Sequence, residues 1–474
     1  MTYKEKHRPQ FHFTPEKNWI NDPNGLVYHE GEYHLFYQCN PYSNEHKDMH
    51  WGHAISADLY HWEEQDIALA PDELGTIFSG SAVVDKNNTS GLFKSDLGGL
   101  VAIFTHDGEN QQQSIAYSED KGRTWKKYDG NPVIPNTEII DFRDPKVFWH
   151  EDNQQWVMSL ACGDHIQFYS SANLIEWTYL SSFGKEYPSY IGVWECPDLI
   201  CLPVENKAKK EWVLIVSINA DGPNGGSAVY YFTGNFDGRT FHPNEKPEDA
   251  LNWADAGKDF YASVSWNNTE DTYWIGWMNN WQYAGVVPVS PWRSSMSIVR
   301  KLSLYEHAGK YLLKQQPIIA DDNKKSVSYQ NVEVAPDTLK NYEINNIAEI
   351  DLKLSEESGA SIWGVTFHTN QDESFRLLID IEKNNYTFYR TEGITDFSTD
   401  FPEKVTGSLN GLSVQTLRAV VDTSSLELFL NEGLSVMTDL IYPRGEITRF
   451  DVFTEKEKLK IDNLTYTKLN SIWI

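Results

Sequence analysis

Cysteines and long apolar runs are rare in this sequence. Its 474 residues include four cysteines, which are too few and too irregularly spaced for a disulfide framework. They also lack the second Cys/His pair that would complete a zinc site. No segment approaches the ~18 consecutive apolar residues that a membrane-spanning helix needs. We therefore predict a chain without a disulfide framework, without a bound metal and without a membrane span.

Basic residues are scarce relative to acidic ones. Lys and Arg number 40 against 68 Asp and Glu, which gives a formal net charge of −28. Such a charge repels phosphate backbones and anionic lipids, so we expect neither a nucleic-acid partner nor a membrane partner. The sequence begins MTYKEKHRPQFHFTP, without the apolar stretch of a secretory signal peptide. We therefore predict a cytoplasmic location; the oligomeric state has no signature in the sequence.

Motifs of nucleotide cofactors and of serine hydrolases are missing as well. The sequence shows no GxGxxG after a strand, no P-loop and no GxSxG turn, so we predict no cofactor. His50 and His53 form a lone HxxH without a carboxylate partner, a pattern that is more often packing than a metal site.

Aromatic residues, by contrast, are abundant, with 17 Trp, 25 Tyr and 22 Phe. They recur with Val and Ile in short alternating runs that Gly, Asn and Asp separate, such as GLVYHEGEYHLFYQ, EWVLIVSI and DTYWIGWM. Period-two alternation is typical of strands, and helical periodicity is scarce. Aromatic rings fill cores and also stack on sugar faces. The sequence therefore predicts an all-β protein.

One local pattern, a strand that ends in Ser-x-Asp/Asn or a similar turn and then an aromatic residue, recurs four times. The copies end at Trp62, Trp125, Trp177 and Phe241, at spacings of 52 to 64 residues. Repeats of this length suit four-stranded propeller blades with variable loops. We therefore predict a β-propeller in the N-terminal part of the chain.

Three carboxylates precede hairpins of the same pattern. Asp22, Asp144 and Glu195 each stand one or two residues before a proline, followed by a strand, a short turn and a second strand. One acidic residue before proline is commonly a turn former. Three in register, with unusual neighbours such as Asn21 and Arg143, point to function instead. Because equivalent inner strand ends of a propeller converge on its central channel, we expect the three carboxylates to face one another.

The composition changes after about residue 317, where a polar stretch is followed by short strands at the spacing of a sandwich. We predict a propeller domain at residues 8–316, a linker at 317–339 and a C-terminal β-sandwich at 340–474.

Three motifs resemble the signatures of the β-fructosidases of glycoside hydrolase family 32, which includes invertases, exo-inulinases and levanases. They are WINDPNG (Trp19–Gly25), FRDP (Phe142–Pro145) and WECPD (Trp194–Asp198). FYQCNP, HWGHAIS, FSGSAVVD and NNWQY…PWRSSMS support them, and the resemblance covers nearly the whole chain. It implies a five-bladed β-propeller followed by a β-sandwich.

The resemblance also implies a retaining, exo-acting hydrolase of terminal β-D-fructofuranosyl units. Asp22 would be the nucleophile, Glu195 the general acid and then the base, and Asp144 would hold fructose hydroxyls. Neighbouring anions would raise the pKa of Glu195 so that it can donate a proton. The same resemblance places the following residues around the fructose: Asn21, Gln38, Trp51, Phe78, Ser79, Arg143 and Trp281. On composition alone, Trp51 and Trp281 fit a core position as well, and Arg143 fits a simple ion pair.

Alternative activities remain open at this point. A sucrose-6-phosphate hydrolase and a fructosyltransferase belong to the same family, although no basic cluster lies beside the motifs. A non-catalytic sugar-binding propeller would use the same aromatic residues, and an inverting arabinan-type propeller hydrolase also uses three carboxylates. From the predicted cytoplasmic location, we expect sucrose and short fructo-oligosaccharides as the substrates.

Overall fold

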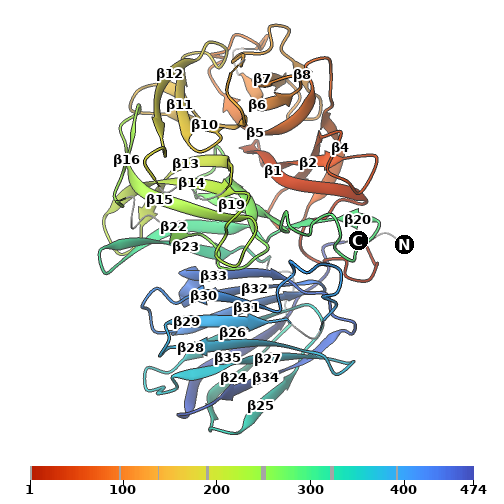
Figure 1. The fold of residues 1–474 in the computed structure, drawn as a ribbon, viewed down its shortest axis with the longest axis vertical. Coiled ribbons are helices and arrows are strands. Elements are labelled where there is room, and N and C mark those ends of the chain that lie inside the picture. Colours follow the sequence, from red (N-terminus) through yellow and green to blue (C-terminus); the bar gives the residue numbers. More distant parts are fainter. Residues whose placement is uncertain are drawn as a thin grey trace.

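The computed structural model describes residues 3–95, 98–136, 138–187, 192–246, 252–320, 325–390 and 393–473. These residues form β-strands and loops, with one short 3₁₀ turn, η2 (Asn431–Gly433). Figure 1 shows two bodies: N-terminal sheets around a common centre in the upper half, and blue C-terminal sheets below them. The prediction of an all-β protein is confirmed. No helix in the described ranges has both the length and the apolar character that crossing a membrane requires.

Three of the N-terminal sheets each contain four consecutive strands, and the first of them also includes β20. The first has the order β20-β1-β2-β3-β4 and comprises β1 (Asn18–His29), β2 (Glu32–Asn40), β3 (His50–Ser56), β4 (Glu63–Leu69) and β20 (Trp292–Arg293). The second has the order β5-β6-β7-β8 and comprises β5 (Thr76–Asp85), β6 (Gly99–Asp107), β7 (Gln111–Ser118) and β8 (Lys126–Lys127). The third has the order β12-β11-β10-β9 and comprises β9 (Phe142–His150), β10 (Gln155–Cys162), β11 (Ile166–Ser171) and β12 (Thr178–Phe183).

A ten-stranded sheet contains the rest of the N-terminal half. Its first part comprises β13 (Trp194–Val204), β14 (Lys209–Ile218), β15 (Ala228–Phe236), β16 (Phe241–Pro243) and β17 (Asn252–Trp253). Its second part comprises β18 (Tyr261–Ser265), β19 (Tyr273–Met278), β21 (Ser295–Met296), β22 (Arg300–His307) and β23 (Lys310–Pro317). A single parallel pair, Val204 with Leu304, joins the two parts.

The innermost strands of the three sheets and of the two parts of the ten-stranded sheet contact one another in a closed ring. Strand β1 contacts β5, β5 contacts β9, β9 contacts β13, β13 contacts β18, and β18 contacts β1 again. In Figure 1 the groups follow one another around the centre in sequence order. Residues far apart in the sequence therefore meet at the centre of the ring.

The repeated Ser-x-Asp/Asn pattern is the turn after the third strand of a sheet. In three copies the serine hydroxyl donates a hydrogen bond to the acidic or amide side chain two residues later, in Ser56–Asp58, Ser118–Asp120 and Ser171–Asn173. The repeat thus marks equivalent points of successive sheets, as the spacing predicts.

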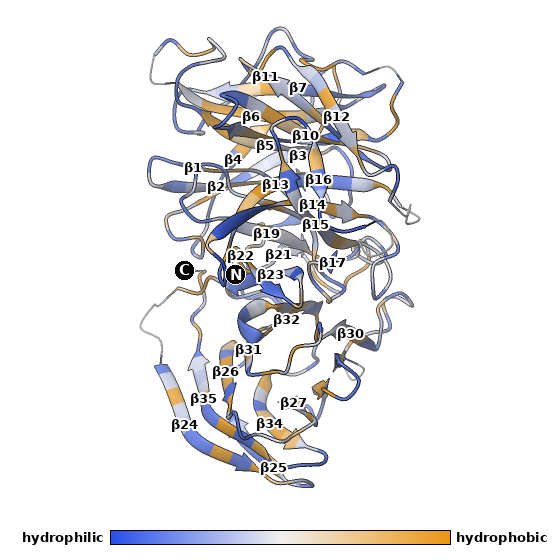
Figure 2. Cartoon of the chain, turned by 90° about the vertical axis from the view of Figure 1, so that its left-hand side faces the viewer, coloured by the Kyte–Doolittle hydropathy of each residue, from blue (hydrophilic) through white to orange (hydrophobic). Residues whose placement is uncertain are grey.

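The C-terminal half consists of two six-stranded sheets around one hydrophobic core. One has the order β24-β35-β26-β31-β32-β33, with β24 (Lys325–Val334), β26 (Ala348–Leu354), β31 (Thr416–Asp422), β32 (Ser425–Leu430), β33 (Ser435–Leu440) and β35 (Leu459–Lys468). The other has the order β25-β34-β27-β28-β29-β30, with β25 (Leu339–Glu343), β27 (Ile362–Thr369), β28 (Ser374–Asp380), β29 (Asn385–Tyr389), β30 (Lys404–Ser408) and β34 (Ile447–Thr454). In Figure 2, hydrophilic and hydrophobic residues alternate along several of these strands, such as β24 and β34.

The predicted linker at 317–339 is wrong in part, because it contains a strand of the C-terminal sheets. Strand β24 pairs with β35 along its whole length, from Lys325 with Lys468 to Val334 with Leu459. It is an edge strand whose side chains are mostly exposed, so its sequence is polar and resembles a linker.

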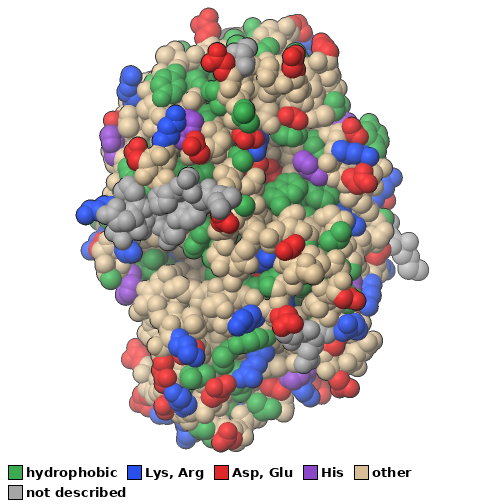
Figure 3. Space-filling view, viewed as in Figure 1, with side chains coloured by type: hydrophobic (Ala, Val, Ile, Leu, Met, Phe, Trp, Pro, Cys, Tyr) green, Lys and Arg blue, Asp and Glu red, His purple; other side chains and the backbone are tan. Residues whose placement is uncertain are grey.

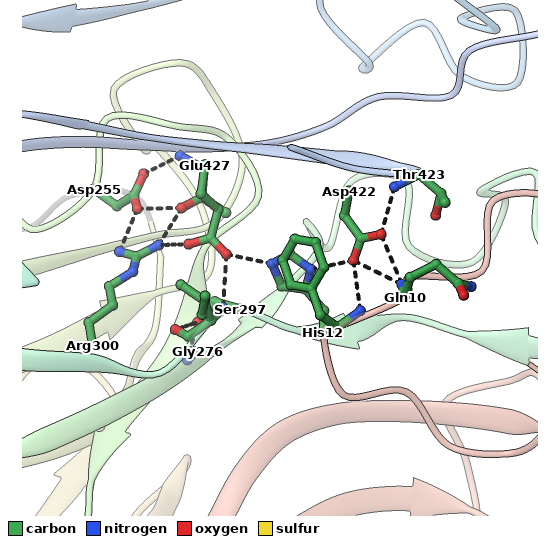
Figure 4. A network of polar contacts seen from close by, with 12 residues as sticks. Gln10, His12, Asp255, Gly276, Ser297, Arg300, Asp422, Thr423 and Glu427 are labelled. Atoms are coloured by element: carbon green, nitrogen blue, oxygen red, sulfur yellow. Dashed lines mark hydrogen bonds and ion pairs between the residues drawn. The ribbon is translucent and has the colours of Figure 1, made fainter. Parts of the chain in front are cut away.

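Buried charges join the two halves of the molecule. His12, near the N-terminus, lies between Asp422 of β31 and Glu427 of β32, with each ring nitrogen 2.8 Å from a carboxylate oxygen (Figure 4). Arg300 of β22 binds Glu427 and also Asp255, at 2.9 Å. All these side chains are buried, so this network fixes the position of one half against the other.

Candidate active site

The same irregularity, a β-bulge, interrupts all five inner strands of the ring. In each strand two residues lie opposite one residue of the neighbouring strand, at residues 21–22 in β1, 78–79 in β5, 144–145 in β9, 196–197 in β13 and 262–263 in β18. Bulges re-aim side chains and are frequent beside active sites. Asp144, Cys196 and Ala262 have positive φ angles of 63°, 46° and 52° at these points. The five bulges therefore turn side chains of five strands toward one site.

The first bulge carries Asp22, whose carboxylate accepts hydrogen bonds from an oxygen and a nitrogen donor. Ser79 Oγ, on the bulge of β5, donates to Oδ2 of Asp22 at 2.7 Å. Asn21 Nδ2 donates to Oδ1 at 3.0 Å, and the Nε1–H of Trp19 fixes the Asn21 amide by donating to its oxygen at 2.8 Å. These contacts fix the orientation of the Asp22 carboxylate within the site.

Glu195, at the start of the bulge in β13, lies between a cation and a phenol. Arg143 Nη2 donates to Oε1 of Glu195 at 2.8 Å, and the hydroxyl of Tyr261 donates to Oε2. Burial is the largest effect on the pKa of Glu195 and raises it; Asp22 adds to this, whereas Arg143 and Tyr261 oppose it. The net result is a pKa above the ordinary value. The predicted direction is therefore right, but burial contributes more to it than the neighbouring anions.

Asp144, on the bulge of β9, is 5% exposed and receives the backbone N–H of Cys196 on Oδ2 at 2.9 Å. Its own N–H donates to Thr105 Oγ1 at 3.1 Å, which holds the bulge in place. The pKa of Asp144 is raised to about 7: burial raises it most, Arg143 lowers it, and the charges of Glu195 and Asp22 raise it. Asp144 and Glu195 are thus two carboxyl groups that retain protons at a higher pH than free side chains.

Cys196 connects the first carboxylate with the second. Its sulfur lies 3.6 Å from Asp22 Oδ2 and 3.7 Å from Asp144 Oδ2. Burial and the adjacent carboxylates raise the pKa of this thiol well above its ordinary value, so it stays neutral and acts as a small buried side chain. Because both distances end at one sulfur atom, the side chains of residues 22 and 144 converge although 122 positions separate them in the sequence.

Aromatic rings lie beside the carboxylates. Trp281, in the loop after β19, is half-buried and lies 4.7 Å from Trp277 and 6.1 Å from Trp19 between ring centroids. His46 packs edge-on against Trp281 at 5.1 Å and lies 6.4 Å from Phe78. In Figure 3 the middle of the upper half is hollowed, and green hydrophobic side chains gather beside the hollow.

Two predicted contact residues are buried more deeply than expected. Trp51 is 0% exposed, and its Nε1–H donates to the Phe78 carbonyl at 3.0 Å. The prediction that Trp51 lines the sugar site is therefore corrected: the ring packs in the core and supports the bulge of β5. Gln38 lies opposite the first bulge, is 2% exposed and donates to Asn24 Oδ1 at 2.8 Å.

The remaining predicted residues do meet at the centre of the ring: Asp22, Asn21, Ser79, Phe78, Arg143, Asp144, Glu195 and Trp281. Sequence reasoning missed Tyr261, His46, Thr105 and the residues that hold Arg143, namely Asp141 and Gln111. Of these residues, only Tyr261 could have been found from the sequence pattern. It is the first residue of β18, the fifth inner strand, and the other inner strands carry site residues near their starts.

Among the described residues, no three His, Cys, Asp or Glu side chains are arranged to hold a metal ion. His53 stacks on Phe36 at 4.2 Å, and His50 contacts the Asp48 carbonyl through its ring Nδ1. The four cysteines are free thiols. A carboxylate that accepts hydrogen bonds and a neighbouring carboxyl with a raised pKa can act as a nucleophile and a general acid.

Comparisons with known proteins agree with this geometry. Residues 12–317 match the glycosyl hydrolases family 32 N-terminal domain, and residues 315–468 match the family 32 C-terminal domain. A levanase of Bacillus subtilis (strain 168) is 46% identical over 99% of this chain and 72% of its own length. The crystal structure of exo-inulinase from Aspergillus awamori superposes with a TM-score of 0.92 at 36% identity, over 100% of both chains. A β-fructofuranosidase from Schwanniomyces occidentalis, complexed with fructosyl-erythritol, gives 0.90 at 33% identity over 99% of both chains.

The comparisons also correct the prediction of a cytoplasmic location. A relative that is 39% identical over 94% of this chain and 91% of its own length is the extracellular exo-inulinase of Aspergillus awamori. The prediction rested only on the composition of the first residues of the given sequence, which does not establish where a protein is located. The family resemblance, in contrast, is confirmed, because family models match both halves and relatives match over nearly the full length. The chain belongs to glycosyl hydrolase family 32.

Proposed function

We propose that this protein is a retaining exo-β-fructosidase that hydrolyses terminal non-reducing β-D-fructofuranosyl units of sucrose, fructo-oligosaccharides and fructans. The observation that carries the proposal is the pair of carboxyl groups with opposite environments. Asp22 accepts hydrogen bonds from Ser79 and Asn21, and Glu195 has a pKa raised by burial. An ionised carboxylate and a protonated carboxyl are the two groups that glycoside hydrolysis requires.

The first step transfers the fructosyl unit to the enzyme. Asp22 attacks the anomeric carbon as the bond to the leaving oxygen breaks, and Glu195 gives its proton to that oxygen. The product is a fructosyl ester of Asp22 and a free alcohol. In the second step Glu195, now ionised, takes a proton from water, the resulting nucleophile attacks the anomeric carbon, and Asp22 leaves as a carboxylate.

Other residues bind the sugar in this proposal. Asp144, Asn21 and Arg143 carry the polar groups that face the site and would hold fructose hydroxyls, while Trp281 and Phe78 supply aromatic surface. Arg143 also keeps Glu195 in place through Oε1. The family's relatives support the substrate class, since they include a levanase, exo-inulinases and an invertase from Wickerhamomyces anomalus.

The finer architecture is part of the same proposal. We assign the N-terminal half to a five-bladed propeller at residues 8–317, because five inner strands carry the same bulge and contact one another in a closed ring. The C-terminal domain then begins with β24 at Lys325 instead of at 340, and its last strand is β35.

Hydrolysis in water–methanol mixtures tests the stereochemistry and the mode of cleavage together. The protein should release one fructose at a time from sucrose, kestose, inulin and levan, and methanol should trap methyl β-fructofuranoside. The α-anomer would show an inverting enzyme, and early long oligosaccharides would show endo cleavage. As a matched control, Asp129→Asn changes an exposed carboxylate that pairs with Lys126 and should leave every product unchanged, whereas Asp22→Asn should abolish them.

A further inference from the structure

A cavity lies at the opposite ends of the strands that build the candidate active site. It has a volume of about 510 Å³, and its wall includes Asp85 at the end of β5, Trp149 near the end of β9, and Asn267 just after β18. The bulges of β5, β9 and β18 lie at the starts of these strands. With a rise of ~3.3 Å per residue, the six residues from Ser79 to Asp85 place the two sites roughly 20 Å apart.

Polar side chains close the path between the two sites. Asn267 Nδ2 donates to the carbonyls of Ala82 and Val147, and thereby bridges β5 and β9. Further along, Lys146 forms an ion pair with Asp198 at 3.2 Å, and both side chains are buried. A molecule in the cavity therefore cannot be the substrate unit held by Asp22; it is a separate ligand or a distant part of a long one.

The wall of the cavity combines polar groups with an aromatic surface that neighbouring residues keep in place. Trp149 is half-buried and packs edge-on against Trp156 at 5.1 Å. The Nε1–H of Trp156 donates to Thr89 Oγ1 at 2.9 Å, and Thr89 in turn donates to Asp85 through both its backbone N–H and its hydroxyl. Because this chain of contacts fixes the indole rings, binding of a ligand costs little side-chain conformational entropy.

Exposed amide side chains lie on the wall beside the rings. Asn87 is exposed and makes no side-chain hydrogen bond to any residue that the structure describes, and Gln154 and Asn268 are exposed amides on the same wall. A volume in this range with aromatic walls and a few polar groups is typical of small-ligand sites. Lys86 stands beside Asp85 and Glu151, so the wall has no excess of positive charge and does not suit a phosphate or another anion.

We propose that this cavity is a second carbohydrate-binding site, which holds a neutral fructosyl segment of a polymeric substrate against Trp149. The inference rests on the proposed function for the identity of the sugar. We therefore expect the cavity to contribute to the binding of fructan polymers, because one polymer chain can reach both sites or two chains can bind at once. It should not affect sucrose, which occupies the active site alone.

Binding is measured in the Asp22→Asn background, so that the polymer is not consumed. Electrophoresis through gels that contain levan, inulin or dextran reports affinity for each polymer. Trp149→Ala should lower the affinity for levan or inulin about fivefold, which is the effect of losing one stacked ring. Trp149→Phe should keep most of the affinity, and Asn87→Ala, which removes no packing, should give a smaller loss. Tyr179→Ala, an aromatic residue of β12 that is 50% exposed and outside the cavity, is the matched control.

Kinetics separates this inference from the proposed function. With Asp22 intact, Trp149→Ala should keep the kcat/KM of wild type on sucrose and raise the KM for levan or inulin. The second site would be overturned if wild type, Trp149→Ala and Asn87→Ala showed the same retardation in polymer gels and the same KM for the polymers. Equal retardation in gels that contain dextran and in gels that contain a fructan would overturn it as well. If the wild type releases no fructose from sucrose, the proposed function fails, whatever the gels show.

Discussion

Tyr261 and Arg143 bind different oxygens of Glu195: the phenol donates to Oε2, and the guanidinium donates to Oε1 at 2.8 Å. Both interactions favour the ionised carboxylate, and both oppose the burial that raises the pKa of Glu195. The proton affinity of this carboxyl is therefore a balance between two donors and a desolvated position. Removal of either donor should change the pH range in which the group works as an acid.

Tyr261→Phe removes a donor that favours the ionised form, so the pKa of Glu195 should rise. A general acid with a higher pKa stays protonated to higher pH, and the alkaline limb of kcat/KM for sucrose should move upward by about one pH unit. The measurement is a pH profile of kcat/KM for wild type and variant. An unchanged alkaline limb would show that Glu195 is not the acid that the profile reports.

Tyr37→Phe provides the control for that experiment. Tyr37 also donates to a glutamate, Glu64 at 3.1 Å, but this pair belongs to β2 and β4 and includes no residue of the site. The variant loses a tyrosine–glutamate hydrogen bond of the same kind and should keep the wild-type profile.

Asp22 and Glu195 differ in what their alanine variants retain. Asp22→Ala removes the group that forms the covalent ester, so activity should be lost on every substrate. Glu195→Ala removes a proton donor, whose value depends on the leaving group. The variant should lose sucrose hydrolysis, yet still form the ester from an aryl β-fructofuranoside and then stall. Added azide, which needs no base, should release a fructosyl azide.

Asp144→Asn should lose rate on both substrate types without rescue by azide, because its proposed role is to hold the sugar in the transition state. Asparagine tolerates the positive φ of 63° at this position, which favours retention of the bulge. Turnover of sucrose and of the aryl fructoside by the three variants, with and without azide, is the measurement. Equal losses of Glu195→Ala on both substrates, unaffected by azide, would assign the acid to another residue.

His12 should make the stability of the protein depend on pH. Burial lowers the pKa of His12, but the carboxylates of Asp422 and Glu427 outweigh it and raise the pKa to about 9, from about 6.5 in an unfolded chain. A raised folded-state pKa adds stability that is fully present below pH 6.5 and is lost as the pH rises through 9. For 2.5 pKa units the free energy of unfolding should fall by about 3 kcal/mol over this window.

His12→Gln isolates that contribution, since glutamine keeps hydrogen-bonding capacity and carries no charge. Urea unfolding at several pH values between 6 and 10 should show a lower stability at pH 6 for the variant and a flatter dependence on pH than for wild type. His61→Gln, in an exposed pair with Asp58, should change the stability by less than about 1 kcal/mol. Parallel curves for wild type and His12→Gln would contradict the assignment.

The all-β fold class and the positions of the three carboxylates were predictable because they depend on local sequence patterns. Alternation of period two at GLVYHEGEYHLFYQ predicts a hairpin, and β1 and β2 form it. The serine turns recur at equivalent points of successive sheets, so their spacing alone indicates a repeated unit. Asp22, Asp144 and Glu195 stand at the same point of three such units, and this symmetry predicts their convergence before any coordinates exist.

Tyr261, the burial of Trp51 and the polar strand β24 were decided by the tertiary structure. Tyr261 meets Glu195 only because the ring closes β18 against β13, a contact between residues 66 positions apart. The motif around Trp51 indicates a site residue, but core packing of the ring against neighbouring sheets sets its exposure to 0%. Strand β24 is polar because it is an edge, and only its partner β35 makes it a strand. Local sequence thus determines the strands and the identity of the acids, whereas burial, and with it the pKa of each acid, depends on which distant segments pack around it.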